Sequence, residues 1–197
     1  MKIILMVAMI AAAGMSVQAR DAAENARPRV IVYVNNDAVQ PRVLQVAESI
    51  AAGMFSSAGV RMEWRGHEPD GGHLAAGAVA IRLAPQTPVH LMPGALAFAR
   101  PYEGVHITVF CDRIQRVAPG SGPTAVVLAH VLVHEITHIL QGSERHSESG
   151  VMKATWTGTD YLEMTSQPLG FTPEDMDRIH RVLALRAPAK ALIAARK

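Results

Sequence analysis

A run of apolar residues from Thr124 to Gln141 carries the pattern His134-Glu135-Ile136-Thr137-His138 in its second half. The turns before this pattern, AVVLAHVLV, are strongly apolar, so the run predicts a buried helix. Four residues advance a helix by about 400°, which places the two imidazoles one turn apart on nearly the same face. Polar side chains on a buried helix need partners. The run therefore predicts a central helix with a polar site on one face.

The same spacing suits a zinc ion. Both imidazoles can reach one ion at about 2.0–2.1 Å, the usual Zn–N distance. Glu135 is rotated by about 100° from His134 along the helix, so it stands beside the ion and addresses a bound water instead of ligating. Zinc lowers the pKa of such a water toward ~7, and a carboxylate can then take its proton. We predict His134 and His138 as metal ligands, Zn²⁺ as the cofactor and Glu135 as the catalytic base.

A catalytic zinc site needs a third protein ligand and an open fourth position, and His146 is our candidate for the third ligand. Gly142 lets the chain leave the helix sharply, and the loop GSER can bring His146 back to the ion. The residues SGVM that follow predict a tight turn carrying Met152.

The segment from His134 to Met152 resembles the metzincins, a clan of zinc endopeptidases in which a third histidine and a methionine turn follow the helix motif. It is also similar to small bacterial exported proteins with an HExxH helix and an HSxxGIM-type turn, and the VYVNN, RMEW and FTPED segments extend this likeness. The resemblance implies a zincin-like fold, a peptide or protein substrate, and Met152 packed beneath the metal without ligating it. The clan pattern is HExxHxxGxxH. Here Gly142 follows His138 by four residues and His146 follows it by eight, so the loop is longer.

Other residues are candidates for roles in this site. The segment GTDY is faintly similar to the aspartate-ligand motif of aspzincins, which makes Asp160 an alternative third ligand. Glu163 is a second alternative, in the role of the remote glutamate of gluzincins. Tyr161 is expected to pack, although it could donate a hydrogen bond to an oxyanion. His130 lies one turn before His134, and we expect it to be buried and hydrogen-bonded.

The first nineteen residues have the pattern of a signal peptide: Lys2, the apolar run IILMVAMIAAAGM, and small residues ending at Ala19. The run is too short to span a bilayer comfortably, and no stop-transfer pattern follows it. We expect a mature chain that begins near Arg20, has no membrane span and works in the periplasm or outside the cell. The one cysteine, Cys111, excludes an internal disulfide framework and is expected to be a buried thiol.

The remaining sequence predicts one domain, 29–188, between a tether, 20–28, and a tail, 189–197. Strands are expected over 29–35, 60–64, 79–83 and 105–110; helices are expected from Pro41 toward Gly59, over Thr124–Gln141, and from Thr172 onward. The fold class is α+β and zincin-like, a small mixed β-sheet packed on the active-site helix, with a C-terminal helix. We expect strand 105–110 to lie at a sheet edge, where it would align an extended substrate.

Composition excludes other function classes. The chain has 19 Lys+Arg against 17 Asp+Glu, a net charge too small for a nucleic-acid footprint, and its 5% of aromatic residues provides no base-stacking platform. Two hypotheses follow: a zinc-dependent hydrolase that cleaves peptide bonds, or a non-catalytic zinc-stabilised binding or structural module. Glu135 favours the enzyme, because a structural zinc site needs no base and closes its fourth position.

Overall fold

The structure, a computed structural model, describes residues 27–69, 73–88, 91, 94–99 and 105–186. The predicted signal peptide, residues 20–26 of the tether and the tail lie outside these ranges. The elements in chain order are β1 (Arg29–Asn36), α2 (Pro41–Ser57), β2 (Arg61–Arg65), β3 (Val79–Ala84), β4 (Ala97–Ala99), β5 (His106–Phe110), α3 (Cys111–Val117), α4 (Ser121–Gln141), α5 (Gly158–Ser166) and α6 (Pro173–Arg186).

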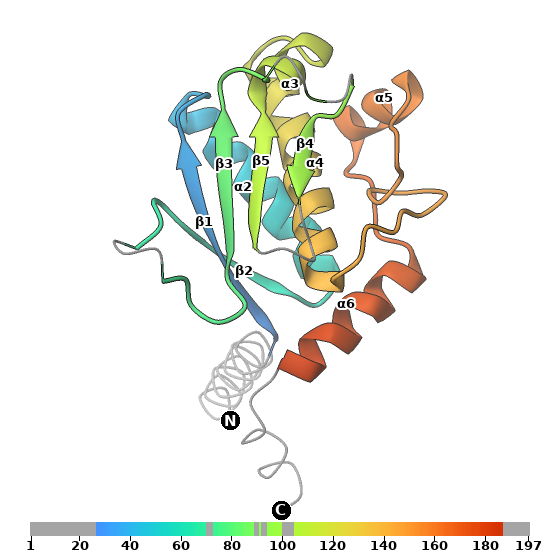
Figure 1. Ribbon diagram of the computed structural model, residues 1–197. Coiled ribbons are helices and arrows are strands. Elements are labelled where there is room, and N and C mark those ends of the chain that lie inside the picture. Colours follow the sequence, from blue (N-terminus) through green and yellow to red (C-terminus); the bar gives the residue numbers. More distant parts are fainter. Residues whose placement is uncertain (1–26, 70–72, 89–90, 92–93, 100–104, 187–197) are drawn as a thin grey trace, which may run out of the picture.

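The strands form one mixed sheet in the order β2-β1-β3-β5-β4 (Figure 1). Neighbouring strands are parallel except β4, which runs antiparallel to β5 at one edge. Val32 of β1 pairs with Val79 of β3, and Ile81 of β3 pairs with Ile107 of β5; all four are buried. These β-branched residues face the helices, as expected for parallel strands whose covered face belongs to the core.

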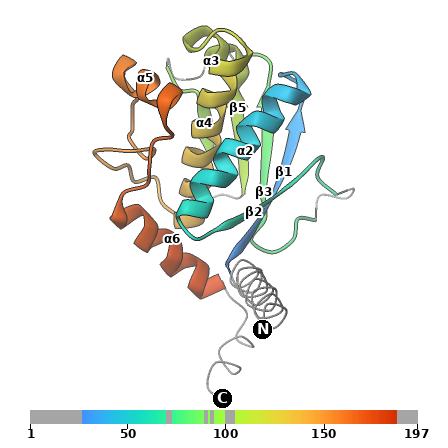
Figure 2. The same ribbon diagram turned by 180° about the vertical axis from the view of Figure 1, so that it is seen from behind.

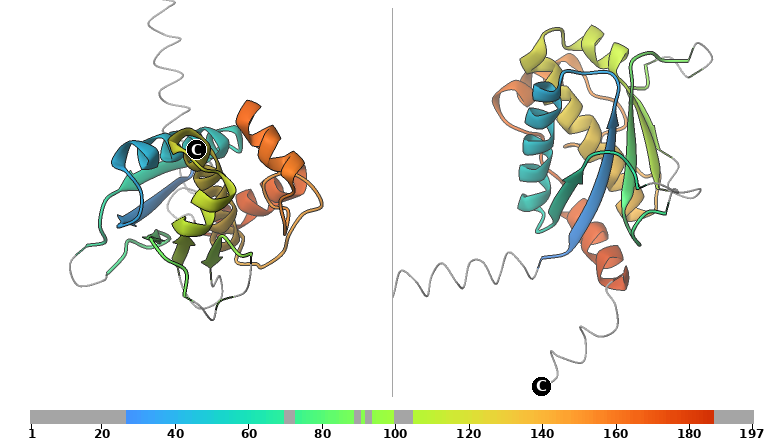
Figure 3. Two further views of the ribbon diagram at one scale, coloured as in Figure 1. Left: turned by 90° about the horizontal axis from the view of Figure 1, so that it is seen from above. Right: turned by 90° about the vertical axis from the view of Figure 1, so that its left-hand side faces the viewer.

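Two helices, α2 and α4, lie side by side on one face of the sheet, and no helix of the described ranges covers the other face (Figures 2 and 3). Helix α2 starts with Pro41 in its first turn and buries a stripe that includes Val43, Ala47, Ala51 and Met54. Pro suits this position because the first turn has no use for its missing N–H. The fold is therefore a two-layer α+β arrangement, with the predicted central helix against the sheet.

Helix α4 is the hydrophobic centre of the molecule. Leu128, Leu132, Ile136 and Leu140 are fully buried along it. Within the described ranges it is also the one helix long and apolar enough to cross a membrane, but 78% of its apolar window is buried inside the protein. Packing against the sheet and α2 accounts for its apolar character.

Three elements were not predicted: β4, α3 and α5. Strand β4 has three residues, too few to show a period, and α3 follows β5 without an intervening turn. The expectation that strand 105–110 forms an edge is wrong, because β5 pairs with β3 on one side and with β4 on the other. The edge is β4. Cys111, the first residue of α3, is buried as expected, and burial raises the pKa of its thiol to about 12.

Candidate metal centre

Helix α4 carries His134, Glu135 and His138 in its last two turns and ends as the sequence predicts. Gly142 adopts a left-handed conformation, with φ 59° and ψ 37°, and its N–H donates to the carbonyl of His138. Glycine takes this conformation without the cost that a Cβ imposes. The chain turns away at this point, and its next residues return past the two histidines.

Both helical histidines are oriented by backbone carbonyls. His134 donates from Nδ1 to the Val151 carbonyl oxygen at 2.8 Å, and His138 donates from Nδ1 to the Ser143 carbonyl oxygen, also at 2.8 Å. A carbonyl only accepts, so each ring carries its hydrogen on Nδ1 and presents an unprotonated Nε2. The two Nε2 atoms lie 3.0 Å apart. Two lone pairs at that distance repel each other unless a cation lies between them.

His146 completes a group of three imidazoles. One ring nitrogen from each of His134, His138 and His146 lies within 4.8 Å of the other two, and the described residues contain no other such group of histidine, cysteine or acidic side chains. Burial lowers the pKa of His134 to about 4 and also lowers that of His138, which keeps both rings neutral. A set of neutral imidazole donors is one that zinc prefers. The residues present therefore fit the predicted metal.

Glu135 lies in the same groove as the histidines, beside them on α4. Burial raises the pKa of its carboxyl to about 7, and no ion pair offsets that burial among the residues described. A carboxylate poised near neutral pH is suited to take and return a proton.

The three imidazoles lie in a groove of about 690 Å³. One wall is β4 with the turn before it, and the other is the segment 153–156 with Tyr161. Trp156 packs edge-on against His134, with ring centroids 5.6 Å apart, and against Tyr161 at 6.3 Å. Tyr161 therefore packs, as expected, but it also lines the groove. The site is open to a long ligand that runs along β4.

Strand β4 borders this groove, and some of its backbone groups point away from β5. Phe110 donates its N–H to the Leu96 carbonyl at 2.9 Å, and hydrogen-bonded and non-bonded pairs alternate along an antiparallel ladder. Phe98 therefore bonds to β5, whereas Ala97 and Ala99 direct their N–H and C=O groups away from it. Both alanines line the groove.

The turn that carries Met152 accepts a hydrogen bond from His134. The Val151 N–H donates to the Gly170 carbonyl at 2.9 Å, while the Val151 carbonyl accepts from His134. Gly150 has φ 74°, and a Cβ there would overlap with the Gly170 oxygen. Met152 is fully buried in the core. Its place beneath the metal stays a prediction.

His130 is fully buried with both ring nitrogens bonded, as expected. Nδ1 donates to the Val126 carbonyl at 2.7 Å, and Nε2 accepts from the Leu169 N–H at 3.0 Å. It fixes the segment that contains Gly170 and therefore supports the turn under the site.

The two alternative third ligands lie elsewhere. The carboxylate of Asp160 accepts hydrogen bonds from Lys153 Nζ at 2.6 and 2.8 Å and closes a capping box with Thr157. The Lys153 ammonium is the main reason why the pKa of Asp160 falls to about 2. Glu163 is exposed on α5 and accepts from Gln167. Neither belongs to the imidazole group.

Trp156 and Lys153 were not singled out from the sequence. Both line the groove, and both follow the Met152 turn closely. That proximity was the only available signal, because neither residue belongs to a metal-binding pattern.

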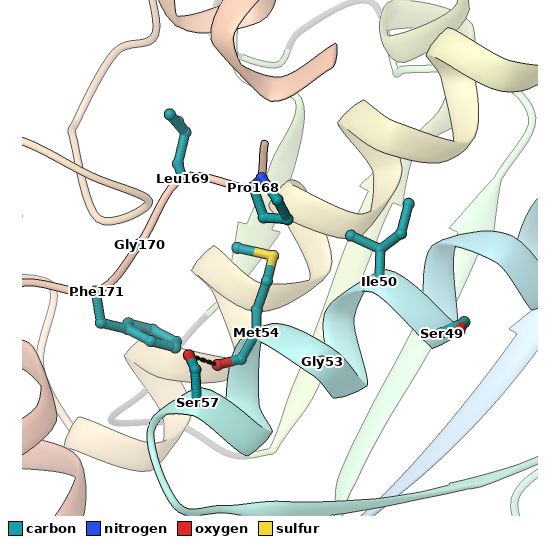
Figure 4. Close-up of a pocket in the computed structure, with 9 residues that line it drawn as sticks. All are labelled: Ser49, Ile50, Gly53, Met54, Ser57, Pro168, Leu169, Gly170 and Phe171. Carbon is teal, nitrogen blue, oxygen red and sulfur yellow. Dashed lines mark hydrogen bonds between the residues drawn. The ribbon is translucent and has the colours of Figure 1, made fainter. Parts of the chain in front are cut away.

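A second hollow of about 380 Å³ lies on the α2 side, between that helix and the segment 168–171 (Figure 4). Met54 and Ile50 of α2 line it together with Phe171. None of its lining residues titrates, so this hollow has no acid, base or metal ligand to offer.

No family model matches the sequence, and no curated protein matches it. A comparison with solved structures finds archaemetzincin from Methanopyrus kandleri, with a TM-score of 0.54 and 15% sequence identity, over 79% of this chain and 96% of that chain. At this identity the likeness concerns the fold. The chain has the zincin-like fold seen in archaemetzincin.

Proposed function

We propose that this protein is a zinc metallopeptidase, in which His134, His138 and His146 hold the ion and Glu135 is the catalytic base. The observation that carries the proposal is the convergence of three imidazoles beside Glu135, a half-buried glutamate whose carboxyl has a raised pKa, in a groove bordered by the edge strand β4. The likeness to archaemetzincin supports the same class of enzyme.

When bound, zinc supplies a Lewis acid that polarises a peptide carbonyl and makes a water a better nucleophile near neutral pH. The residues of the chain transfer the proton and bind the substrate. Glu135 takes a proton from the attacking water and delivers it to the leaving amine. The outward N–H and C=O groups of Ala97 and Ala99 pair with an extended substrate and hold its scissile bond over the histidines.

The second hypothesis is a zinc-stabilised module without turnover. It predicts an ion whose fourth position is closed by a protein ligand. The described residues bring three metal-binding side chains together and leave the groove open beside them, which favours the enzyme.

The test is cleavage of casein or a peptide library by purified protein, with and without chelator. We expect chelator-sensitive cleavage that zinc restores. Glu135→Gln should bind zinc as the parent does and lose cleavage about 10²-fold or more, the usual contribution of general base catalysis. Glu148→Gln, at an exposed glutamate in the loop after His146, is the matched control and should stay active. Zinc binding without cleavage in the parent would support the module instead.

We also propose that the chain is exported, on the basis of residues 1–19. Expression of the full chain in a bacterial host should give a product that begins near Arg20 outside the cytoplasm. A cytoplasmic product with the leader intact would contradict export.

A further inference from the structure

We infer that Asp175, acting through Ser147, is the positioning residue that holds His146 in place as the third ligand. This inference rests on the proposed zinc site.

Ser147, the residue after His146, is fixed from two directions. Its backbone N–H donates to the Met152 carbonyl at 2.8 Å, and its hydroxyl donates to Asp175 Oδ1 at 2.7 Å. The first bond ties the third ligand to the turn beneath the site, and the second ties it to α6. His146 itself is exposed, and its ring contacts those of His134 and His138, with centroids 5.2 and 4.9 Å apart, so its position on the other side depends on the backbone of its loop.

Asp175 is itself rigidly held. Its Oδ2 accepts from the Thr172 hydroxyl at 2.7 Å and from the Thr172 N–H at 3.1 Å, while its own N–H donates to the Thr172 hydroxyl at 3.2 Å. These are the reciprocal bonds that begin a helix. Its carbonyl accepts from Gln141 Nε2 at 3.3 Å, at the last residue of α4.

A helix cap does not need a buried carboxylate, but Asp175 is only 4% exposed. Burying a charge is costly unless hydrogen bonds or an opposite charge compensate for it. Ser147 supplies one of those hydrogen bonds.

The hydrogen bond between Ser147 and Asp175 compensates for the length of the loop between His138 and His146. Between His138 and His146 the chain has two residues more than the clan pattern HExxHxxGxxH. Each added residue widens the range of positions that a loop end can sample. The bond from Ser147 to Asp175 removes that freedom. A second contact between the loop and α6, Arg145 with Glu174, has both side chains more than half exposed, and such pairs contribute little.

The experiment measures zinc affinity in a competition with a chromophoric chelator. We expect Ser147→Ala and Asp175→Asn to weaken zinc binding about 10–100-fold, the range found when groups behind metal ligands are removed. Ser147→Thr keeps the hydroxyl and should restore binding. Ser149→Ala, an exposed serine in the same turn, and Asp177→Asn, an exposed acid on the same helix, are the matched controls and should bind as the parent does.

A second readout separates positioning from general stability. In cobalt-loaded protein, the visible spectrum reports which side chains hold the ion, so Ser147→Ala should shift it toward that of His146→Ala. Parent-like affinity and an unchanged cobalt spectrum in Ser147→Ala would overturn the inference, whatever the thermal stability of the variant. If the parent binds no zinc, the proposed function fails. If the parent binds zinc and the variants bind it with the same affinity and cobalt spectrum, the inference fails and the proposed function stands.

Discussion

Glu135 illustrates how burial sets chemistry at a single residue. Burial removes water from its carboxyl, so the charged form is disfavoured and the pKa of that carboxyl rises from 4.5 to about 7. The metal-free protein therefore loses stability when this group ionises. The residue that the proposed reaction needs is one that folding alone would not favour.

A pH series on metal-free protein tests this conflict. The pKa of Glu135 is higher in the folded state than in the unfolded state. The loss of stability caused by its ionisation is therefore absent below pH 4.5, grows between pH 4.5 and 7, and is complete above pH 7. Glu135→Gln imitates the neutral acid. In chelator, we expect the variant and parent to be equally stable near pH 4, and the variant to be more stable at pH 8 by about 3 kcal/mol. The measurement is urea unfolding at each pH. Equal stability of the two proteins at pH 8 would show that burial does not raise this pKa.

At the scale of elements, the sequence predicted those with a clear period and missed the short ones. The four long strands and helices α2, α4 and α6 show apolar alternation or a capping pattern, and each is present close to its predicted bounds. Strand β4 is missed because its pairing depends on β5, and three residues contain no period. Helix α5 is capped by Thr157 and Asp160, a signal that was present in the sequence but assigned to a possible metal ligand.

The residues of the site also fall into those that the sequence predicts and those that it does not. The spacing within one helix predicts how His134 and His138 meet, because helix geometry is local. The return of His146 depends on Gly142, which the sequence shows, and on Asp175, which lies 29 residues further along the chain. Contacts over such a distance cannot be obtained from periodicity.

The edge strand provides a test at the same scale. Proline removes an N–H, and it is tolerated in an edge strand where that group faces outward. Ala99→Pro should leave the sheet intact and lower kcat/KM about three- to tenfold, because one hydrogen bond to the substrate is lost. Phe98→Pro, in contrast, removes a bond to β5 and should lower the melting temperature. An Ala99→Pro variant with parental kcat/KM would show that substrates do not pair with β4.

At the scale of the whole molecule, the metal centre joins distant parts of the chain. Helix α4 supplies two of the three imidazoles, the loop after it supplies the third, and Val151 and Asp175 connect this group to the segment 168–171 and to α6. Each of these connections is made only in the folded state. Zinc binding should therefore stabilise the entire fold and not the site alone.

A thermal series measures this coupling. Zinc at a thousandfold excess over its Kd should add about 4 kcal/mol to the free energy of unfolding and raise the melting temperature by several degrees. His134→Ala should show no such increase, and its metal-free melting temperature is the reference. Stabilisation of His134→Ala equal to that of the parent would place the binding elsewhere.

The tether between Ser147 and Asp175 also affects how distant relatives can be found. A search profile that fixes the distance from the second histidine to the third passes over chains with extra loop residues. A profile that describes the contacts instead would allow any number of residues between the second histidine and the third. It would require a hydroxyl residue directly after the third histidine and a Thr-x-x-Asp start to the final helix. Such a profile would group proteins by these contacts, and loop length could vary among them.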